Sequence, residues 1–545
     1  MNYEIRIRED GRYAIFDENG NMITKEWFDE IKPYGLVKGQ SKYYLAKKGE
    51  KSAIFDVDGK MITPQWFDGI DTSGLVEGQS PYYRAQKDWK LAIFDKDGNM
   101  ITPEWFDGII EDGLVRGQSK YYIVLKDGKY AIFDKDGNMI SPGWFDKIEE
   151  YGLVEGRSNL YIVSKDDKWA IFDEKGNMIS PEWFDEIEPD GLVKGESNYY
   201  LAKKDGEWAI FDVDGNQISQ WFDWIREYGL VKGESKYYRA KKDGKWAIFD
   251  INGNRITDWY NDVSLEGLVR GKSNYYIAEK NWKEAIFDIN GNMITKEWFD
   301  EISLYGLVLG ESNLYIARKD GKWAIFDING KQITKDWFDY IYEYGLVRGQ
   351  SNLYIVAEGS KYAIFDKDGK QITQWFDEIE PYGLLKGESP YYIAKKNGKY
   401  AIFDKDGNQI SQWFDKIWGY GLVEGKSDYY IAEKDGEYAI FDKDGNMISP
   451  EWFDYIYYNE LLNGQGHYFI ACKYKKDNNC AVYYKDGRKV SDDFSLGIGW
   501  VKKITFNENL GIAEIKTYNG TRTIDFNPVY PFKEKIIDYT KLLNI

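Results

Sequence analysis

One tetrapeptide, Ala-Ile-Phe-Asp, recurs twelve times along the 545-residue chain, and each copy begins 38 or 39 residues after the previous one. A fixed period of this length is typical of repeat architectures, in which each unit buries its apolar surface against its neighbours. The one-residue difference arises where residues 178–183 of one unit correspond to residues 217–221 of another. Insertions are tolerated best in loops, so we expect a loop at this point of every unit.

The unit that spans residues 199–235 predicts β-structure throughout. Two segments rich in aromatic and apolar residues, 199–204 and 207–212, flank an Asp-Gly pair. A two-residue Asp-Gly loop favours a hairpin, because both positions need a positive φ. We expect further short strands around 217–219 and at 229–231, separated by a loop that carries Trp-Phe-Asp. No segment has a sustained 3.6-residue period, so the sequence predicts an all-β protein.

The hairpin register decides which side chains share a face. With a two-residue loop, alternation places Leu201, Lys203, Trp208 and Ile210 on one face. The opposite face carries two aromatic residues and two alanines, and it is nearly constant from unit to unit. We therefore expect the constant face to pack between neighbouring units.

The face that carries Trp208 varies more. Its positions accept Arg84, Ser52 and Glu284 in other units. Because such residues do not belong in a dry core, this face is predicted to be partly wet. We expect the mostly aromatic Trp208 position to form an exposed binding stripe, consisting of Trp169, Trp208, Trp246, Trp323, Tyr130, Tyr362, Tyr400 and Tyr438.

The repeats predict an array over residues 1–454, followed by divergent C-terminal repeats and a cap over 455–545 with a short helix at 532–543. An open solenoid or superhelical stack is favoured, because twelve units exceed the usual number of blades in one β-propeller. Two tandem propellers are the alternative. The seam between them would fall at the irregular units near Trp259, where the motif is altered, and Trp282, a bulky turn residue. The bulky turn residue Trp89 marks a further irregular unit.

The motif K-W-A-I-F-D-x-x-G, followed by I-T/S, W-F-D-x-I and G-L-V, resembles the bacterial WG repeat family over residues 1–454. In this chain the Gly of the family's Trp-Gly pair is Ala in every unit, and only four units keep the Trp. The resemblance implies a tandem β-repeat module. A weaker likeness, to the aromatic repeats of carbohydrate-binding arrays, rests on the Tyr-Tyr, Asp-x-x-Gly and Trp elements.

Residues suited to catalysis are scarce. His467 is the single histidine of the chain, so a serine–histidine triad or a histidine metal site is not expected. The serine after Gly-x in most units has no activating base beside it, and we interpret it as a turn hydroxyl. The Asp-x-Asp-Gly-Asn turns vary too much for a calcium loop. We predict no enzyme, no metal and no cofactor.

Composition narrows the partners. The balance of 72 basic and 91 acidic residues argues against nucleic acid as a ligand. No signal peptide or membrane-spanning run of apolar residues is apparent, which predicts a cytoplasmic location and no membrane insertion. The two cysteines, Cys472 and Cys480, are expected to be buried or free thiols, although the pair could bridge.

Three functional hypotheses follow from these observations. The first is a non-catalytic protein-interaction or structural scaffold whose partner is another protein. The second is a carbohydrate or cell-surface binding array that takes a glycan. The third is an acidic inhibitor or immunity-type protein that captures a basic partner.

Overall fold

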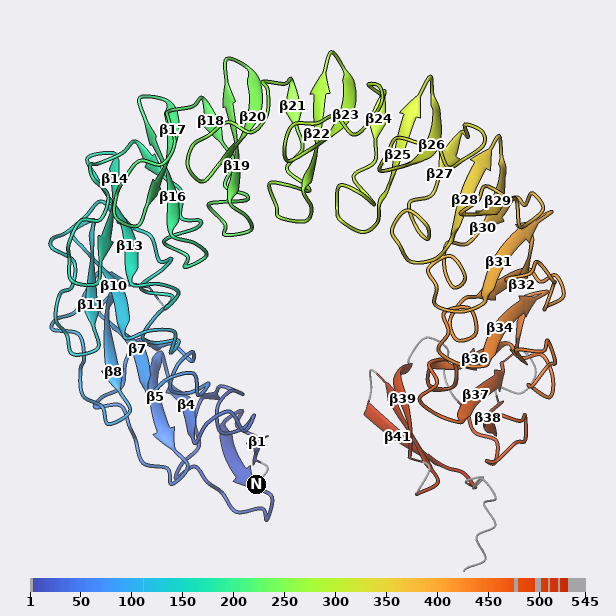
Figure 1. Cartoon of the computed structure of the whole chain (residues 1–545). Coiled ribbons are helices and arrows are strands. Elements are labelled where there is room, and N and C mark those ends of the chain that lie inside the picture. Colours follow the sequence, from blue (N-terminus) through green and yellow to red (C-terminus); the bar gives the residue numbers. More distant parts are fainter. Residues whose placement is uncertain are drawn as a thin grey trace, which may run out of the picture. The chain divides into compact units, whose positions relative to one another are not determined.

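The computed structural model describes residues 3–110, 112–474, 479–495, 501–507, 510–517 and 520–527. Strands and turns make up nearly all of these residues, and the one α-helix among them, α1 (Asn459–Leu462), has four residues. The strands form successive antiparallel sheets, the first with two strands and the others with three. Figure 1 shows these sheets following one another along the chain, so the prediction of a tandem all-β repeat array is confirmed. Within the described ranges no helix has the length and apolar character needed to cross a membrane.

Each repeat contributes a hairpin with the predicted register. Strands β16 (Tyr199–Lys204) and β17 (Glu207–Asp212) are antiparallel, with Ala202 opposite Ala209 and Lys203 opposite Trp208. The connecting residue Asp205 has a φ of 53°, as a type I′ turn requires. The local sequence therefore determines both the turn and the pairing of the two long strands.

The third strand of each sheet comes from an unexpected place. Strand β15 (Glu186–Ile187) follows the Trp-Phe-Asp motif of one repeat and pairs with β16, the first hairpin strand of the next repeat. The expected strand at 229–231 is wrong, because these residues form a turn. Gly229 has a φ of 83° there, and a Cβ on it would lie 2.2 Å from the carbonyl oxygen of Tyr237. The expected strand at 217–219 is reduced to a single bridge between Gln217 and Phe211.

The described chain divides into two compact units. The first reaches to residue 281 and includes 288–292; the second comprises 282–287 and the residues from 293 onward. The division falls at the irregular Trp282 turn. The first unit holds β1 (Tyr3–Ile7), β2 (Tyr13–Asp17), β3 (Glu30–Ile31), β4 (Tyr43–Lys48), β5 (Lys51–Asp56), β6 (Gly69–Ile70), β7 (Tyr82–Lys87), β8 (Lys90–Asp95), β9 (Gly108–Ile109), β10 (Tyr121–Lys126), β11 (Lys129–Asp134), β12 (Lys147–Ile148), β13 (Leu160–Lys165), β14 (Lys168–Asp173), β15, β16, β17, β18 (Trp224–Ile225), β19 (Tyr237–Lys242), β20 (Lys245–Asp250), β21 (Asp262–Val263) and β22 (Tyr275–Lys280).

The second unit starts with β23 and contains the last repeats and the C-terminal strands. These elements are β23 (Lys283–Asp288), β24 (Glu301–Ile302), β25 (Leu314–Lys319), β26 (Lys322–Asp327), β27 (Tyr340–Ile341), β28 (Leu353–Glu358), β29 (Lys361–Asp366), β30 (Glu378–Ile379), β31 (Tyr391–Lys396), β32 (Lys399–Asp404), β33 (Lys416–Trp418), β34 (Tyr429–Lys434), β35 (Glu437–Asp442), β36 (Tyr455–Tyr457), α1, β37 (Tyr468–Lys473), β38 (Asn479–Tyr484), β39 (Val501–Asn507), β40 (Ile512–Thr517) and β41 (Gly520–Asp525).

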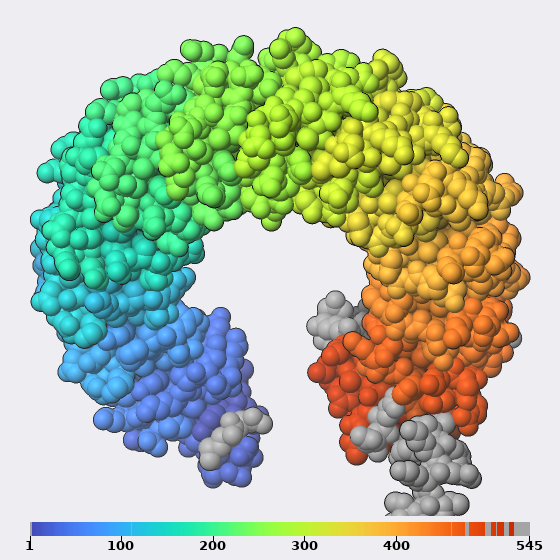
Figure 2. All heavy atoms as spheres, in the orientation of Figure 1, coloured from blue at the N-terminus to red at the C-terminus, as the bar shows by residue number. Residues whose placement is uncertain are grey.

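Both faces of the sheet of β15, β16 and β17 are packed. Its variable face, predicted to be partly wet, is buried at Leu201, Trp208 and Ile210 and half-buried at Lys203. In the first unit, Leu201 and Ile210 lie in one core with Tyr238 and Phe249 of the following sheet. Leu201 and Ile210 are 1% and 0% exposed. The variable face of one repeat therefore covers the constant face of the next, and Figure 2 shows the surfaces of successive repeats of this unit in continuous contact.

The aspartate of Trp-Phe-Asp links neighbouring repeats through two polar contacts, and we call this arrangement an aspartate pin. One carboxylate oxygen of Asp107 lies 2.8 Å from Lys90 Nζ of its own repeat, and the other accepts the backbone N–H of Asp127 in the next hairpin turn at 2.9 Å. These two bonds hold the pKa of the Asp107 carboxyl below its ordinary value. The same arrangement recurs at Asp68, Asp146, Asp185, Asp300, Asp339, Asp377 and Asp415.

The serine after Gly-x forms a second hydrogen-bonded link between repeats, which we call the serine pin. Ser158 Oγ accepts the backbone N–H of Leu160 at 3.2 Å, which is the predicted turn contact. Its hydroxyl also donates to the carbonyl oxygen of Val193 in the next repeat at 2.6 Å. The sequence predicted the local bond and missed the one between repeats.

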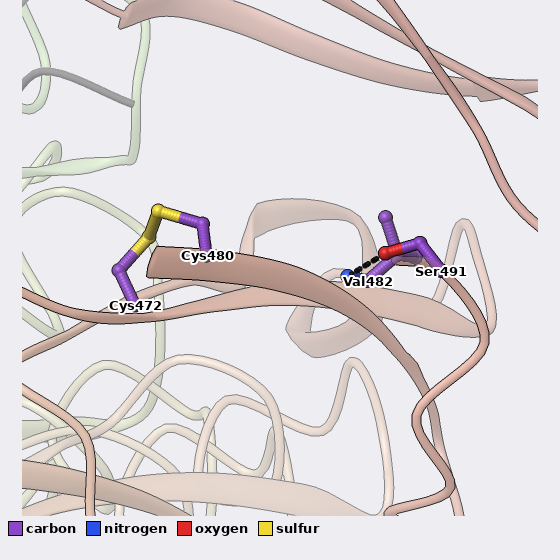
Figure 3. The surroundings of a disulfide bond; sticks show 4 residues. All are labelled: Cys472, Cys480, Val482 and Ser491. Atoms are coloured by element: carbon purple, nitrogen blue, oxygen red, sulfur yellow. Dashed lines mark hydrogen bonds between the residues drawn. A yellow bond between two sulfur atoms is a disulfide. The ribbon is translucent and has the colours of Figure 1, made fainter. Parts of the chain in front are cut away.

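The C-terminal strands continue and then close the second unit. The predicted thirteenth hairpin is present as β37 and β38, and the cysteines form a disulfide across it, so the expectation of two thiols is wrong (Figure 3). Strands β39, β40 and β41 form a final sheet whose Ala513 and Ile515 lie in one core with Cys472 and Cys480. The predicted helix at 532–543 lies outside the described residues.

Replacing a large buried side chain on either face of the sheet by alanine should destabilise the array. We expect Trp208→Ala and Phe211→Ala each to cost about 3–5 kcal/mol, because both side chains are 3% exposed. Tyr130→Ala, at a half-buried position equivalent to Trp208, should cost less. Native-state hydrogen exchange measures the local free energy of unfolding, in β16–β20 for Trp208→Ala and Phe211→Ala and in β10–β14 for Tyr130→Ala. Equal, small effects for Trp208→Ala and Tyr130→Ala would contradict the packing of the variable face.

Removing the aspartate pins should weaken the array in a pH-dependent way. We expect Asn at Asp68, Asp107, Asp146 and Asp185 together to lower the melting temperature at pH 7. The pKa of each of these carboxyl groups is lower in the folded protein than in the unfolded chain. Such a group stabilises the fold at pH values above its unfolded-state pKa, and this stabilisation is lost as the pH falls through its folded-state pKa. The difference from the wild type should therefore shrink towards pH 2–3.

A matched control changes the same number of charges at turn aspartates whose side chains form no hydrogen bond or ion pair with another repeat in the described chain, namely Asp58, Asp97, Asp136 and Asp214. Melting curves at several pH values should show little effect of the control at any pH. A pH-independent loss in the pin variant would indicate that packing, and not the carboxylates, is responsible.

Candidate binding surfaces

Three side chains lie in a row across each sheet, next to the hairpin turn. In the sheet of β15, β16 and β17 this tip row is Glu186, Lys203 and Trp208, since Glu186 pairs with Lys203 and Lys203 with Trp208. All eight aromatic residues predicted to bind occupy the third place of the tip row of their sheets.

The predicted aromatic stripe is less exposed than expected. Trp208 and Trp246 are 3% and 9% exposed, and the other six residues are half-buried. The reason is that the neighbouring repeat covers this face, a contact that the pattern within one repeat does not report.

Cations of the same tip row also cover several of these rings. Lys203 Nζ lies 5.4 Å from the centre of the Trp208 ring and 3.4 Å from a carboxylate oxygen of Glu186. The same acid–cation–aromatic row occurs at Glu301, Arg318 and Trp323 and at Glu378, Lys395 and Tyr400. These three tip rows therefore satisfy their own charges and offer little open ring surface.

The sheet of β18, β19 and β20 departs from this arrangement. Its tip row is Trp224, Lys241 and Trp246, with a tryptophan where four other sheets have glutamate. These residues line an open hollow of about 410 Å³, together with Asp223, Arg226 and Gly244. Trp224 is 41% exposed.

A buried arginine supports this hollow. Arg239 Cζ lies 3.8 Å from the centre of the Trp246 ring, and its guanidinium pairs with Asp262 at 2.5 Å. Burial lowers the pKa of Arg239 to about 10. The Trp246 ring is thus fixed from within, while Trp224 remains accessible.

A second surface lies at the opposite end of the hairpins, on the Tyr-Gly-Leu-Val loops of the second unit. Arg348 Cζ lies 4.7 Å from the ring centre of Tyr305 and 5.5 Å from that of Tyr344. Lys386 Nζ lies 5.0 Å from Tyr344 and 4.3 Å from Tyr382. We call this chain of rings and cations, with Tyr420 and Lys426 at its end, the tyrosine ladder.

The ladder is exposed and ends in a hollow. Tyr305, Tyr382 and Tyr420 are 37%, 42% and 49% exposed. Tyr420 also lines a hollow of about 360 Å³ with Tyr458, Leu462 and Asn463. Neither the ladder nor this hollow was predicted, although the Tyr-Gly-Leu-Val motif with a following Lys or Arg recurs visibly in the sequence.

Two single tryptophans stand out at hairpin turns. Trp89 and Trp282 are each 88% exposed, with φ values of 65° and 63°. A bulky residue in the left-handed region is rare. The sequence identified both turns as irregular, and the structure places each ring alone at a turn.

The residues suited to chemistry do not converge. His467 is exposed, with its ring centre 6.2 Å from that of Tyr484. In the Asp-x-Asp-Gly-Asn turn, Asp95 Oδ1 accepts two backbone N–H groups and Oδ2 accepts the side-chain amide of Asn99. The carboxylate therefore organises the turn. Across the described ranges no three acidic, histidine or cysteine side chains are placed to hold a metal ion.

No protein-family model and no curated protein matches the chain. Similar solved structures include a crystal structure of the eukaryotic initiation factor, 13% identical, which covers 62% of this chain and 96% of that chain at a TM-score of 0.25. Kluyveromyces lactis Hsv2 is 11% identical and covers 46% of this chain and 88% of its own at 0.20. TM-scores this low carry no argument, and the WG repeat resemblance remains a prediction.

One half-buried acid lies between two repeats near the ladder. Burial raises the pKa of Glu380 to about 7, and the neighbouring Glu378 and Glu424 add to the rise. Gly419 of the next repeat lies against it, since a Cβ there would be 3.7 Å from Glu380 Oε2. The ionised carboxylate is thus less well solvated in the fold than in the unfolded chain.

Glu380→Gln should therefore stabilise the protein at high pH. An acid whose pKa is raised in the fold destabilises it progressively as the pH rises from the ordinary value through the folded value. We expect a higher melting temperature than the wild type at pH 8–9 and no gain at pH 5. Glu301→Gln, which loses the equivalent exposed ion pair with Arg318 in another repeat, is the control. A gain that is the same at both pH values would rule out ionisation as the cause.

Proposed function

We propose that the chain is a non-catalytic repeat protein that acts as an interaction scaffold and binds a partner protein along the tyrosine ladder. The observation that carries the proposal is the unbroken series of rings and cations from Tyr305 to Tyr382, in which the two outer rings are exposed and Tyr344 is half-buried. Tyrosine and arginine are the side chains most often responsible for binding energy at protein interfaces.

The ladder is also ordered before any partner arrives. Arg348 and Lys386 each lie between two rings of successive repeats, and Arg348 additionally pairs with Glu311 at 2.8 Å. Side chains that are already held lose little conformational freedom on binding. The repeat spacing would present the same chemistry at regular intervals to an extended segment of a partner.

Charge distinguishes this scaffold from an inhibitor of basic proteins. The net charge of −19 favours a basic partner in general. The ladder itself carries Arg348, Lys386 and Lys426, so a neutral or acidic segment fits it better. The scaffold proposal therefore takes precedence over capture of a basic partner.

Replacing the exposed rings tests the proposal. We expect Tyr305→Ala, Tyr382→Ala and Tyr420→Ala together to reduce partner capture at least about tenfold while the fold is retained, because interface rings of this kind contribute about 2 kcal/mol each. The measurement is affinity capture from the native cell with mass spectrometry, beside thermal melting. The matched control carries alanine at the same repeat position in the first unit, at Tyr34, Tyr151 and Tyr228. Equal capture by both triple variants would contradict the assignment of the ladder.

A further inference from the structure

The hollow of sheet β18–β20 differs from its counterparts by a specific exchange. In four other sheets the first residue of the tip row is a glutamate that pairs with the cation opposite. The pairs are Glu30–Lys47 at 3.1 Å, Glu186–Lys203 at 3.4 Å, Glu301–Arg318 at 3.2 Å and Glu378–Lys395 at 3.4 Å. Trp224 takes the place of that glutamate opposite Lys241.

The exchange leaves two cations without an acid. Within the described part of the chain, neither Lys241 nor Arg226 lies within ion-pair distance of a carboxylate. Arg226 Cζ lies 6.0 Å from the ring centres of both Trp224 and Trp246, so the positive charge is held over the hollow. In a protein of net charge −19, two unpaired cations beside one hollow are suited to an external anion.

The same exchange provides a flat apolar wall. The Trp224 ring is 41% exposed and is steadied by an edge contact with Trp208, at 5.7 Å between ring centres. Gly244 in the hairpin turn has no atom within 4 Å of where a Cβ would lie, so the approach to the hollow is open. An exposed indole of this kind stacks on the apolar face of a ring.

A carboxylate in the hollow adds a hydroxyl acceptor. Asp223 Oδ2 accepts the backbone N–H of Asp243 at 2.8 Å, as in the other aspartate pins. Glu207 stands where other repeats have the lysine that neutralises this aspartate. Asp223 is therefore open to ligand hydroxyl groups.

We propose that this hollow binds an acidic sugar, a pyranose that carries a carboxylate. The ring face stacks on Trp224, the carboxylate pairs with Arg226 and Lys241, and ring hydroxyl groups donate to Asp223. The proposal assigns a small-molecule ligand to the first unit and is independent of partner binding at the tyrosine ladder.

The test uses the full chain and a set of named probes. Isothermal titration with a glucuronate-containing oligosaccharide should show binding that weakens as salt is raised. A neutral glucose oligosaccharide and inorganic phosphate should each bind at least about tenfold more weakly, since each lacks either the charge or the stacking face. Indole-3-acetate, which offers a carboxylate on an aromatic ring without sugar hydroxyls, should also bind more weakly.

Trp224→Glu is the decisive variant, because it restores the glutamate of the other sheets and should fold as they do. We expect it to reduce binding of the glucuronate oligosaccharide at least about tenfold. Arg226→Gln should also reduce binding of the glucuronate oligosaccharide at least about tenfold, although it leaves Trp224 in place. Trp89→Gly removes a more exposed tryptophan at a distant turn and should leave binding unchanged. The proposal is overturned if Trp224→Glu still binds, if the neutral sugar or indole-3-acetate binds as well as the acidic sugar, or if the glucuronate probe does not bind at all.

Discussion

A three-stranded sheet with two apolar faces is the constraint on which the rest of the structure depends. One repeat alone would expose Tyr200 and Phe211 on one side and Leu201 and Ile210 on the other. Stacking buries all four almost completely, because the variable face of each sheet covers the constant face of the next. Apolar burial is the main favourable term in such an assembly, and it is available only to neighbours. The last sheet, β39–β41, provides the same cover for β37 and β38 without having the repeat motif.

Apolar packing alone does not fix the orientation of one sheet on the next. The hydrogen bonds of the aspartate and serine pins fix it. The aspartate of Trp-Phe-Asp joins a lysine of its own repeat to a backbone N–H group of the next hairpin turn. The serine after Gly-x reaches the carbonyl oxygen of the following Leu-Val turn. Two such bonds at opposite ends of the hairpin fix how one sheet is placed on the next. This explains why motifs with no catalytic partner recur with so little change.

The two proposed binding surfaces lie on parts of the repeat that the core does not need. The alanines Ala240 and Ala247 of the sheet that carries Trp224 remain fully buried, as in other repeats. The exchange of glutamate for tryptophan alters only the tip row, so it adds a wall and releases two cations without disturbing the packing. The tyrosine ladder follows the same rule at the opposite ends of the hairpins, because its rings lie outside the stacked faces.

The sequence alone determined the repeat length, the hairpins, their register and the turns with positive φ, because these follow from local sterics and from hydrogen bonds between residues close in the chain. It also identified the two exposed turn tryptophans as irregular. Only the tertiary structure decided that residues 224–225 pair with the next hairpin, that the variable face is covered, and that Cys472 meets Cys480 in a disulfide. Those contacts either join neighbouring repeats or depend on strand pairing in a degenerate segment. The predicted stripe of eight aromatic residues correctly identified the tip row. It did not include Trp224, which lines the open hollow in that row, because Trp224 pairs with a strand of the following repeat.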